Sequence, residues 1–342
     1  MTKSARIASI AIKSGRLGKI RASFGADWSW LAVMALATAI EFAWWTATWI
    51  QGFAPAPFLL TYLALAFCGL ACVLIMRQFF QARSSGMNWL SILIGTILIA
   101  VGASAFLPLK YAIPGIVPFW LDPLLAKADR AMFFGADPWL VLNSWLGWAI
   151  IPMDRLYGLW LPTQSLVLFA LLIQPASVAK SRALIAYVLA WLLLGVVAAT
   201  VLSSAGPIFH DRLFGGTEFA ALHETLESRG AWMVLAESNA MWASLSSGRP
   251  GMVAGISAVP SIHVAVSLWI FLVARKMARR LAPVAFCYFA IIWTGSVQLG
   301  WHYSIDGLAG ALGMLLIWTA SGAGSPKTSQ RNPDADCQRG HA

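Results

Sequence analysis

Charged residues are scarce in this chain. Of its 342 residues, 11% are charged, and only 14 are aspartate or glutamate. A soluble domain carries roughly 25% charged residues, because water must solvate its surface. Hydrophobic residues make up 59% of the chain, and its mean hydropathy is +0.72. The scarcity of charge therefore excludes an ordinary soluble domain and predicts an integral membrane protein.

Cysteine is also rare, with four residues in the whole chain. Cys68, Cys72 and Cys287 lie inside apolar runs, and Cys337 lies in a polar C-terminal segment. Their spacing matches neither a metal site nor a disulfide framework. We therefore expect no metal ion and no other cofactor.

Basic residues outnumber acidic ones, which gives the chain a formal net charge of +10. They occur in short clusters between apolar runs, and they form neither a stripe nor a module that would fit a nucleic-acid groove. We therefore expect no nucleic-acid partner. Basic clusters of this kind are typical of loops on the cytoplasmic side of a membrane.

The apolar runs predict an all-α bundle of about eight transmembrane helices, since about 20 residues are needed to cross the hydrocarbon core. The predicted spans are 28–50, 57–76, 89–108, 155–174, 183–203, 259–275, 282–300 and 303–321. With the N-terminus in the cytoplasm, alternation places every dense basic cluster and both termini on the cytoplasmic side. We expect the inner or plasma membrane of a bacterium.

This pattern divides the chain into four regions. They are a basic cytoplasmic N-terminus (1–27), N-terminal transmembrane helices with an interfacial segment (28–152), a core (153–322) and a polar cytoplasmic tail (323–342). We expect the tail to be disordered, because it is polar and aperiodic. Glu41, in the middle of the first predicted span, either lines a substrate path or is a protonated structural residue.

Two segments between the spans are expected on the outer side. In segment 113–152, Asp122 and Asp137 each precede a proline, which predicts an aspartate cap with proline as the first helical residue. The apolar residues that follow predict two short amphipathic helices at the interface, and a loop packed over the bundle is the alternative. The second segment, 204–258, is expected to be the largest hydrophilic loop.

Two short strings at the outer ends of predicted spans contain the residues suited to chemistry. They read GISAVPSIH at residues 255–263 and GWHYSIDG at residues 300–307. His302 and Asp306 are four residues apart, so on a helix they share a face. A carboxylate bonded to one imidazole nitrogen leaves the other free to attack. His263, from another helix, is suited to protonate an alkoxide leaving group.

The same strings offer groups that bind phosphate. Ser261, at a helix start, presents a hydroxyl and free backbone amides. An acid such as Asp306 near the start of an apolar span is costly and usually has a partner or a function. A histidine satisfied at the membrane interface is the alternative for His263 or His302 taken alone. The joint placement of both histidines and an acid favours an active site.

These strings resemble the type 2 phosphatidic acid phosphatase superfamily. Its second motif, Pro-Ser-x-His, matches Pro260, Ser261 and His263, and its third motif ends in His-x-x-x-Asp, which matches His302 and Asp306. The resemblance implies a six-helix core, a phosphohistidine intermediate at His302, protonation of the leaving group by His263, and no metal. It covers roughly the last third of the chain.

The chain also departs from the full signature of that superfamily. The position of the arginine before the nucleophilic histidine holds Ser296, and Trp242 stands where a lysine precedes Arg249 by seven residues. The run SAGP at residues 204–207 and the His-Tyr-x-x-Asp motif of His302, Tyr303 and Asp306 are similar to the branch of the inositol phosphorylceramide and sphingomyelin synthases. The resemblance implies an inositol phosphorylceramide synthase-like inositolphosphotransferase.

A site with few fixed cations suits a phosphodiester, which carries one negative charge, better than a phosphomonoester, which carries up to two. The leading interpretation is therefore a membrane lipid phosphotransferase that acts on a phospholipid or sphingolipid, with its active site on the non-cytoplasmic face. The alternatives are a lipid phosphate phosphatase that uses water, and a non-catalytic lipid transporter or binding protein on the same fold. Arg212 and Arg249 are further candidates for contact with the substrate, together with Ser261 and Tyr303.

Overall fold

The computed structural model describes residues 27–44, 46, 55–79, 87–249 and 255–322. Within these residues every regular element is helical and no strand occurs. After a first helix over residues 27–44, the main elements are α2 (Pro55–Phe79), α3 (Trp89–Ile116), α4 (Asp122–Met132), α5 (Pro138–Leu146), α6 (Ile150–Gly158), α7 (Trp160–Leu172), α8 (Val178–Ala190), η2 (Trp191–Ala198), α9 (Ala199–Val201), α10 (Pro207–Phe214), α11 (Ala220–Arg229), α12 (Trp232–Ser247), α13 (Ile262–Met277), α14 (Ala282–Gln298) and α15 (Ser304–Ala320).

Several helices are long and apolar enough to cross a membrane. Four meet this condition among the described residues: Leu59–Gln78, Trp89–Ile116, Val178–Val201 and Arg279–Gln298. A fifth is the pair Pro138–Gly158 and Trp160–Leu172, if the two are counted together despite a bend of 43°. The chain is therefore an integral membrane protein with an all-α fold. The count of eight spans stays a prediction, because α13 and α15 have only 16 and 17 residues.

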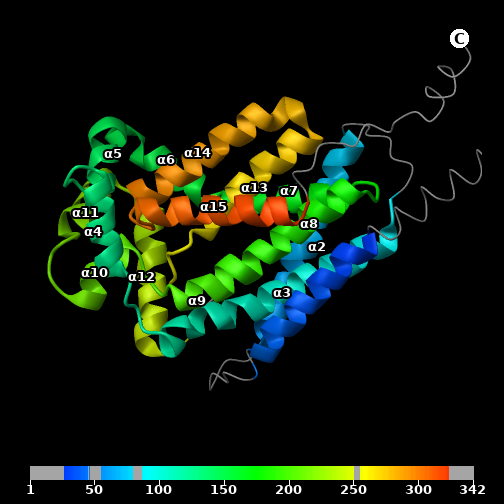
Figure 1. Ribbon diagram of the computed structural model, residues 1–342, viewed down its shortest axis with the longest axis horizontal. Helices are drawn as coiled ribbons and strands as arrows, with labels where there is room; N and C mark the ends of the chain where they lie inside the picture. The colour runs from blue at the N-terminus through cyan, green and yellow to red at the C-terminus, as the bar shows by residue number, and fades with distance from the viewer. Residues whose placement is uncertain (1–26, 45, 47–54, 80–86, 250–254, 323–342) are drawn as a thin grey trace, which may run out of the picture.

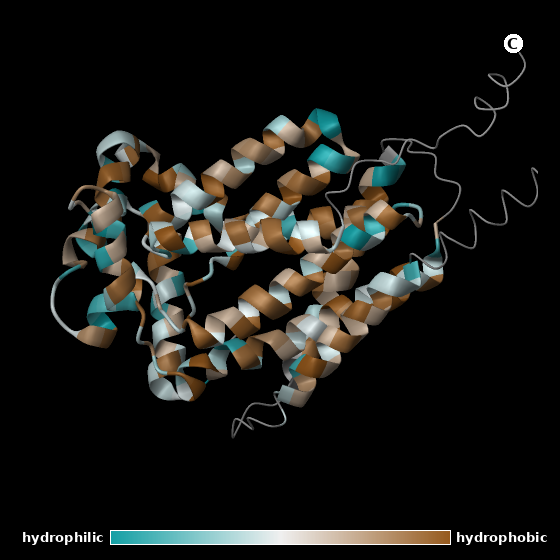
Figure 2. Ribbon diagram, viewed as in Figure 1, coloured by the Kyte–Doolittle hydropathy of each residue, from teal (hydrophilic) through white to brown (hydrophobic). Residues whose placement is uncertain are grey.

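The helix bundle carries a group of shorter helices at one of its ends (Figure 1). Helices α13, α14 and α15 pack against one another, and α8 packs against α15. Helices α4, α10, α11 and α12 gather at one end of this bundle (Figure 1). Together with α5, these four helices form the cap of the bundle. Apolar residues cover most of the bundle helices (Figure 2), as expected for surfaces that face lipid.

The basic residues of α8 and α13 lie at the end opposite the cap. Arg275 and Lys276 are in the last turn of α13, whereas His263 is in its first. Arg182, near the start of α8, donates a hydrogen bond of 2.9 Å to the carbonyl of Gly322, just beyond α15. Basic residues of α8 and α13 are thus gathered at one end, and the predicted orientation in the membrane stays a prediction.

The N-terminal helices are joined to the bundle by a buried polar cluster. Asp27 lies 3.4 Å from the ammonium of Lys180 in α8, and both side chains are almost fully buried. Asp27 also accepts hydrogen bonds from Ser91 of α3 and from the indole of Trp30. Because breaking a buried ion pair leaves an uncompensated charge, this cluster ties the first helix and α3 to α8.

Two sequence-based expectations about segments are wrong in detail. The predicted span 155–174 is broken at Leu159, where α6 ends and α7 begins. The predicted hydrophilic loop 204–258 is largely helical, because it contains α10, α11 and α12. The expected disordered tail, 323–342, lies outside the described residues, as do residues 1–26. The four-region division and both interpretations of Glu41 stay predictions; Glu41 is buried near Gly102 of α3.

The two short helices predicted in segment 113–152 are present as α4 and α5, and their place at the membrane interface stays a prediction. Their aspartates do not cap them. Asp122 is the first residue of α4, and its carboxylate binds another segment. Asp137 is the N-cap of α5, yet its side chain makes no capping hydrogen bond, since it binds Arg130. Proline does occupy the start of both helices, as predicted.

Candidate active site

The two motif histidines come together where the bundle meets the cap. His263 lies in the first turn of α13, and His302 lies two residues before α15. Their ring centroids are 5.7 Å apart, with an angle of 60° between the rings. His302 is only 4% exposed. The sequence prediction that residues from two separate strings meet is confirmed in geometry.

His302 and Asp306 also meet, although His302 is not on the helix. Its Nδ1 lies 3.5 Å from Oδ2 of the fully buried Asp306. The same Oδ2 accepts a hydrogen bond of 3.0 Å from the amide of Tyr303, which holds the carboxylate at the start of α15. The His302 amide donates to the carbonyl of Ser296 at 3.0 Å, so the backbone on both sides of the imidazole is fixed.

Aromatic side chains enclose His263. Its ring lies 4.2 Å from Trp160 and is stacked on Tyr157 at 5.1 Å, both distances between centroids. The Trp160 indole also donates a hydrogen bond of 3.0 Å to the His263 carbonyl. Since Tyr157 and Trp160 flank the break at Leu159, the bend between α6 and α7 is what turns this aromatic wall toward α13.

Each imidazole has a buried nitrogen that makes no hydrogen bond to a described residue. In the part of the chain that the structure describes, neither Nδ1 of His263 nor Nδ1 of His302 has a hydrogen-bond partner. Most buried polar atoms in proteins do have one, and exceptions often mark functional sites. Nδ1 of His302 faces Asp306, so it is the buried Nδ1 of His263 that indicates a site for a polar group.

His302 is held in its neutral form. Burial and, next, the positive charge of Lys110 lower the pKa of His302 to about 3, while the backbone of Ala258 acts in the opposite direction. A neutral imidazole has a free lone pair and is therefore competent as a nucleophile at neutral pH.

The string at residues 255–263 is held by its neighbours. The amide of Ala258 donates to the carbonyl of Ser204 at 2.8 Å, and the amide of Val259 donates to the Ser204 hydroxyl at 3.2 Å. The Ser261 hydroxyl accepts from the amide of Val264 and caps α13. The amide of Ser261 donates to the Asp306 carbonyl at 3.0 Å, so the expectation that this amide is free for phosphate is wrong.

Three aspartates from the cap and from α6 hold the segments around the histidines. Asp122 accepts from the amides of Ala205 and Gly206, Asp129 from those of Ser304 and Ile305, and Asp154 from those of Met233 and Val234. All three are buried. The sequence does not reveal them, because their partners are backbone amides of distant segments.

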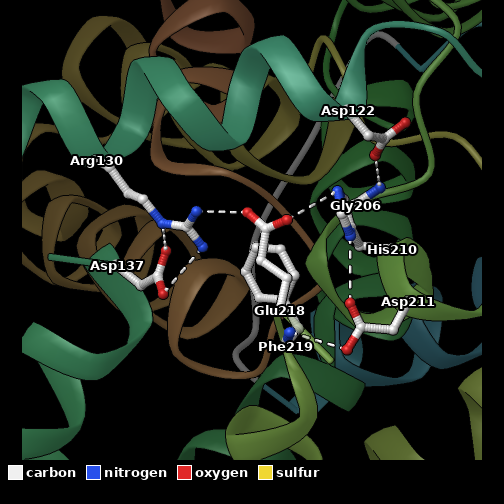
Figure 3. A network of polar contacts seen from close by, with 8 residues as sticks. All are labelled: Asp122, Arg130, Asp137, Gly206, His210, Asp211, Glu218 and Phe219. Carbon is white, nitrogen blue, oxygen red and sulfur yellow. Dashed lines mark hydrogen bonds and ion pairs between the residues drawn. The ribbon is translucent and has the colours of Figure 1, made fainter. Parts of the chain in front are cut away.

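A second polar network lies beside Asp122 in the cap (Figure 3). Arg130 binds Asp137 at 2.7 Å and also binds Glu218, while His210 lies 3.8 Å from Glu218. Asp211 accepts a hydrogen bond from the amide of Phe219, which is shown at the lower end of the network. Its acids neutralise Arg130 and connect α4, α5 and α10, so the network holds the cap together.

The remaining predicted residues lie apart from the histidine pair. Arg212 donates to Asn239 at 2.7 Å and lies over the ring of Trp242, on α12. Arg249 is exposed beyond the end of α12. Tyr303 is buried, and its hydroxyl lies near the carboxyl group of Asp122. The structure therefore brings together His263, His302 and Asp306, with Ser261 next to them.

Lys110 of α3 is the residue that the sequence reading missed. Among the described lysines and arginines, Lys110 is the one whose charge acts on His302 and on His263. The predicted third span ends at residue 108, so Lys110 reads as an ordinary lysine just beyond a membrane helix. Only the packing of α3 against the motif strings distinguishes it.

Comparison with known proteins gives one match. A family model described as the PAP2 superfamily covers residues 123–320, from α4 to the end of α15. No curated protein and no solved structure matches the chain. The matched region includes both motif strings and begins ahead of the core that the sequence pattern places at residue 153. The chain belongs to the PAP2 superfamily, and it is a phosphatase-like membrane enzyme whose activity is directed at lipid phosphates.

Proposed function

We propose that this enzyme is a lipid phosphotransferase that works through a phosphohistidine at His302. In this proposal Asp306 orients His302 from its Nδ1 side and leaves Nε2 for attack, and His263 is the general acid and base. The observation that carries the proposal is the meeting of two imidazoles from separate motifs, 5.7 Å apart, with a buried carboxylate 3.5 Å from one of them. This is the arrangement of nucleophile, orienting acid and proton donor.

The reaction has two balanced steps. First, with His263 protonated as imidazolium, His302 attacks phosphorus, an N–P bond forms and the P–O bond to the leaving alcohol breaks. The leaving alkoxide takes the proton of the His263 imidazolium, which becomes a neutral imidazole. Second, an acceptor alcohol gives its proton to His263 and attacks phosphorus, and the N–P bond breaks. Each imidazole returns to its starting state, so no redox partner or metal is needed for the balance.

The charge around the histidines favours transfer of a phosphodiester over hydrolysis of a phosphomonoester. Among the described lysines and arginines, Lys110 is the one whose charge acts on both histidines, and Arg212 binds Asn239 instead. A single fixed cation matches the single negative charge of a phosphodiester. This supports the inositol phosphorylceramide synthase-like branch, with a phospholipid or sphingolipid as the substrate.

The position of the site supports an orientation. The histidines lie at the cap end of the bundle, and the described basic residues of α8 and α13 lie at the other end. The positive-inside rule places that basic end in the cytoplasm. The proposed active site is then on the non-cytoplasmic face, and both termini are cytoplasmic.

The first experiment is a search for the covalent intermediate. Purified wild-type protein and His302→Ala are incubated with phosphorus-labelled phospholipids and quenched in base, and protein-bound label is tested for acid sensitivity. Acid-sensitive, base-stable label in the wild type and none in the variant is expected. Wild-type lipid turnover that persists in His302→Ala would show that the enzyme uses a different nucleophile.

The second experiment separates transfer from hydrolysis. Product formation is measured with and without an acceptor alcohol, including inositol, at fixed donor lipid. Transfer predicts a new phosphodiester product whose yield rises with acceptor concentration. Release of phosphate at a rate that ignores the acceptor supports the lipid phosphatase instead. Lipid movement without turnover, unchanged in His302→Ala, supports the non-catalytic transporter.

A further inference from the structure

Helix α3 lies outside the region that matches the family, yet it contributes to the wall of the site. Lys110 is 21 residues after Trp89, the start of α3, which places it about 30 Å along the helix. The next residue, Tyr111, donates a hydrogen bond to the carbonyl of Ser244 in α12, so this end of α3 lies where the bundle meets the cap. The motif histidines lie at the same end.

The face of α3 that carries Lys110 is turned toward His263. Phe106 is four residues before Lys110, so the two side chains share a face. The Phe106 ring lies 4.8 Å from Trp191, and Trp191 lies 6.1 Å from Trp160. Trp160 lies 4.2 Å from His263. An aromatic series therefore connects this face of α3 to the proposed proton donor.

The first motif string lies directly on Lys110. A Cβ atom placed on Gly255 would lie 2.8 Å from Cγ and 2.9 Å from Cβ of Lys110. Gly255 has a φ of +93°, which is open to glycine and strained for other residues. The string that ends in His263 thus begins by packing its backbone against the lysine stem. This contact places the stem of Lys110 beside the start of the string that leads to His263.

The ammonium group of Lys110 is not neutralised by a close ion pair. In the described ranges no carboxylate oxygen lies within 4.0 Å of it, in contrast to Lys180 and Arg130. The acid whose charge acts on Lys110 is Glu237 of α12. A membrane-embedded cation without a close counter-ion is costly and usually marks a ligand path.

We propose that Lys110 binds the phosphate of the lipid substrate, and that Glu237 is its counter-ion while the site is empty. This inference rests on the proposed function and adds to it the cation that is missing from the family motifs. It also gives α3 a role in recognition. Because one lysine balances one charge, the site selects a phosphate that carries a single negative charge.

Anion binding tests the proposal without turnover. Orthovanadate, which is mainly singly charged at neutral pH, is titrated calorimetrically into the purified full-length protein. Lys110→Met is expected to weaken binding by about tenfold or more, since a hydrogen bond to a charged group is lost. Lys110→Arg retains most of the affinity, and Glu237→Gln binds several-fold more tightly because the competing anion is removed. Lys127→Met, an exposed lysine on α4, is the matched control and stays at the wild-type value.

The pH dependence of turnover provides a second readout. His302 is faced by Lys110 from α3, by His263 from α13 and by Asp306 from α15. A nearby positive charge disfavours imidazolium, so its removal raises the pKa of His302. The acid limb of kcat/KM is therefore expected to move to higher pH in Lys110→Met. A merely structural lysine would lower activity without moving this limb.

The outcomes separate this inference from the proposed function. If His302→Ala abolishes turnover but Lys110→Met binds vanadate within twofold of the wild type, with an unmoved acid limb, Lys110 does not bind the phosphate. If Glu237→Gln binds no more tightly than the wild type, Glu237 is not the counter-ion. If His302→Ala turns over lipid like the wild type, the proposed function itself is wrong. If Lys110→Met does not fold, the vanadate affinities of Lys110→Arg and Glu237→Gln still test the proposal.

Discussion

Gly206 lies directly against the carbonyl oxygen of Trp301, the residue before His302. Its φ of +95° lies in the region that favours glycine, and its amide donates to the carboxylate of Asp122 at 2.8 Å. The amide of Ile208 reinforces the contact, since it donates to the carbonyl of Gly300 at 2.9 Å. The run SAGP therefore serves as the surface on which the proposed nucleophile is positioned.

Replacing Gly206 with alanine is expected to disturb this surface. The new Cβ would overlap the Trp301 carbonyl and would require a strained φ, so we expect a loss of about 1–3 kcal/mol in stability and a larger loss of activity than of folded protein. Thermal unfolding in detergent and lipid turnover measure the two effects. Gly215→Ala, also at positive φ but in open space, is the control for backbone strain alone. Equal effects of the two substitutions would contradict a positioning role for Gly206.

Asp306→Asn tests the orientation of His302. The amide keeps an oxygen for the Tyr303 amide but lacks the charge that stabilises a developing imidazolium. We expect kcat to fall about 10²–10⁴-fold, as for other oriented histidines, with little change in thermal stability. Glu224→Gln, an exposed acid on α11, should match the wild type. Retention of more than half of the wild-type kcat by Asp306→Asn would argue against the orienting role.

The role of His263 can be tested by changing the leaving group. An alkoxide needs a proton as it departs, whereas p-nitrophenolate does not. His263→Ala is therefore expected to lose about 10²–10⁴-fold in rate on an alkyl phosphodiester and much less on a p-nitrophenyl phosphodiester. His302→Ala should lose activity on both substrates, which supplies the comparison. An equal loss on both substrates in His263→Ala would assign His263 to binding or packing.

The sequence predicted the parts of the site that are contained in short strings. These strings allowed the prediction of His263, His302 and Asp306, because the spacing of these residues and their positions at the ends of predicted spans place them close together. Asp122, Asp129 and Asp154 were not, since each binds backbone amides of a segment far away in sequence. The side chain of an acid gives no indication of which distant amide it will meet.

Lys110 and the break at Leu159 escaped prediction for a related reason. Hydropathy locates a lysine near the end of an apolar run but does not give the direction in which its helix face points. Hydropathy also predicts one span over 155–174, because composition does not reveal the bend of 43° between α6 and α7. Both features depend on packing between segments that are distant in sequence. Lys110 depends on the contact between α3 and Gly255, and the break depends on how α6 and α7 pack in the bundle.

Asp129 links the cap to the nucleophile, and its protonation gives a prediction about pH. It accepts hydrogen bonds from the amides of Ser304 and Ile305 at the start of α15, at 2.6 and 3.1 Å. Burial raises the pKa of Asp129 to about 6, above its value of about 3.9 in an unfolded chain. The folded state therefore binds this proton more tightly, so the contribution of Asp129 to stability is present below about pH 4 and is lost as pH rises through about 6.

Asp129→Asn removes this titration but keeps an acceptor for the α15 amides. We expect the stability of the wild type relative to Asp129→Asn to rise as pH is lowered from about 7 to about 4, measured by thermal unfolding in detergent. Asp129→Ala removes the acceptor as well, so it should be less stable than Asp129→Asn at every pH and should lose turnover, because the start of α15 positions His302. A stability difference between the wild type and Asp129→Asn that does not vary with pH would show that Asp129 does not titrate in this range. Equal turnover in the alanine and asparagine variants would show that the link from α4 to α15 does not position the nucleophile.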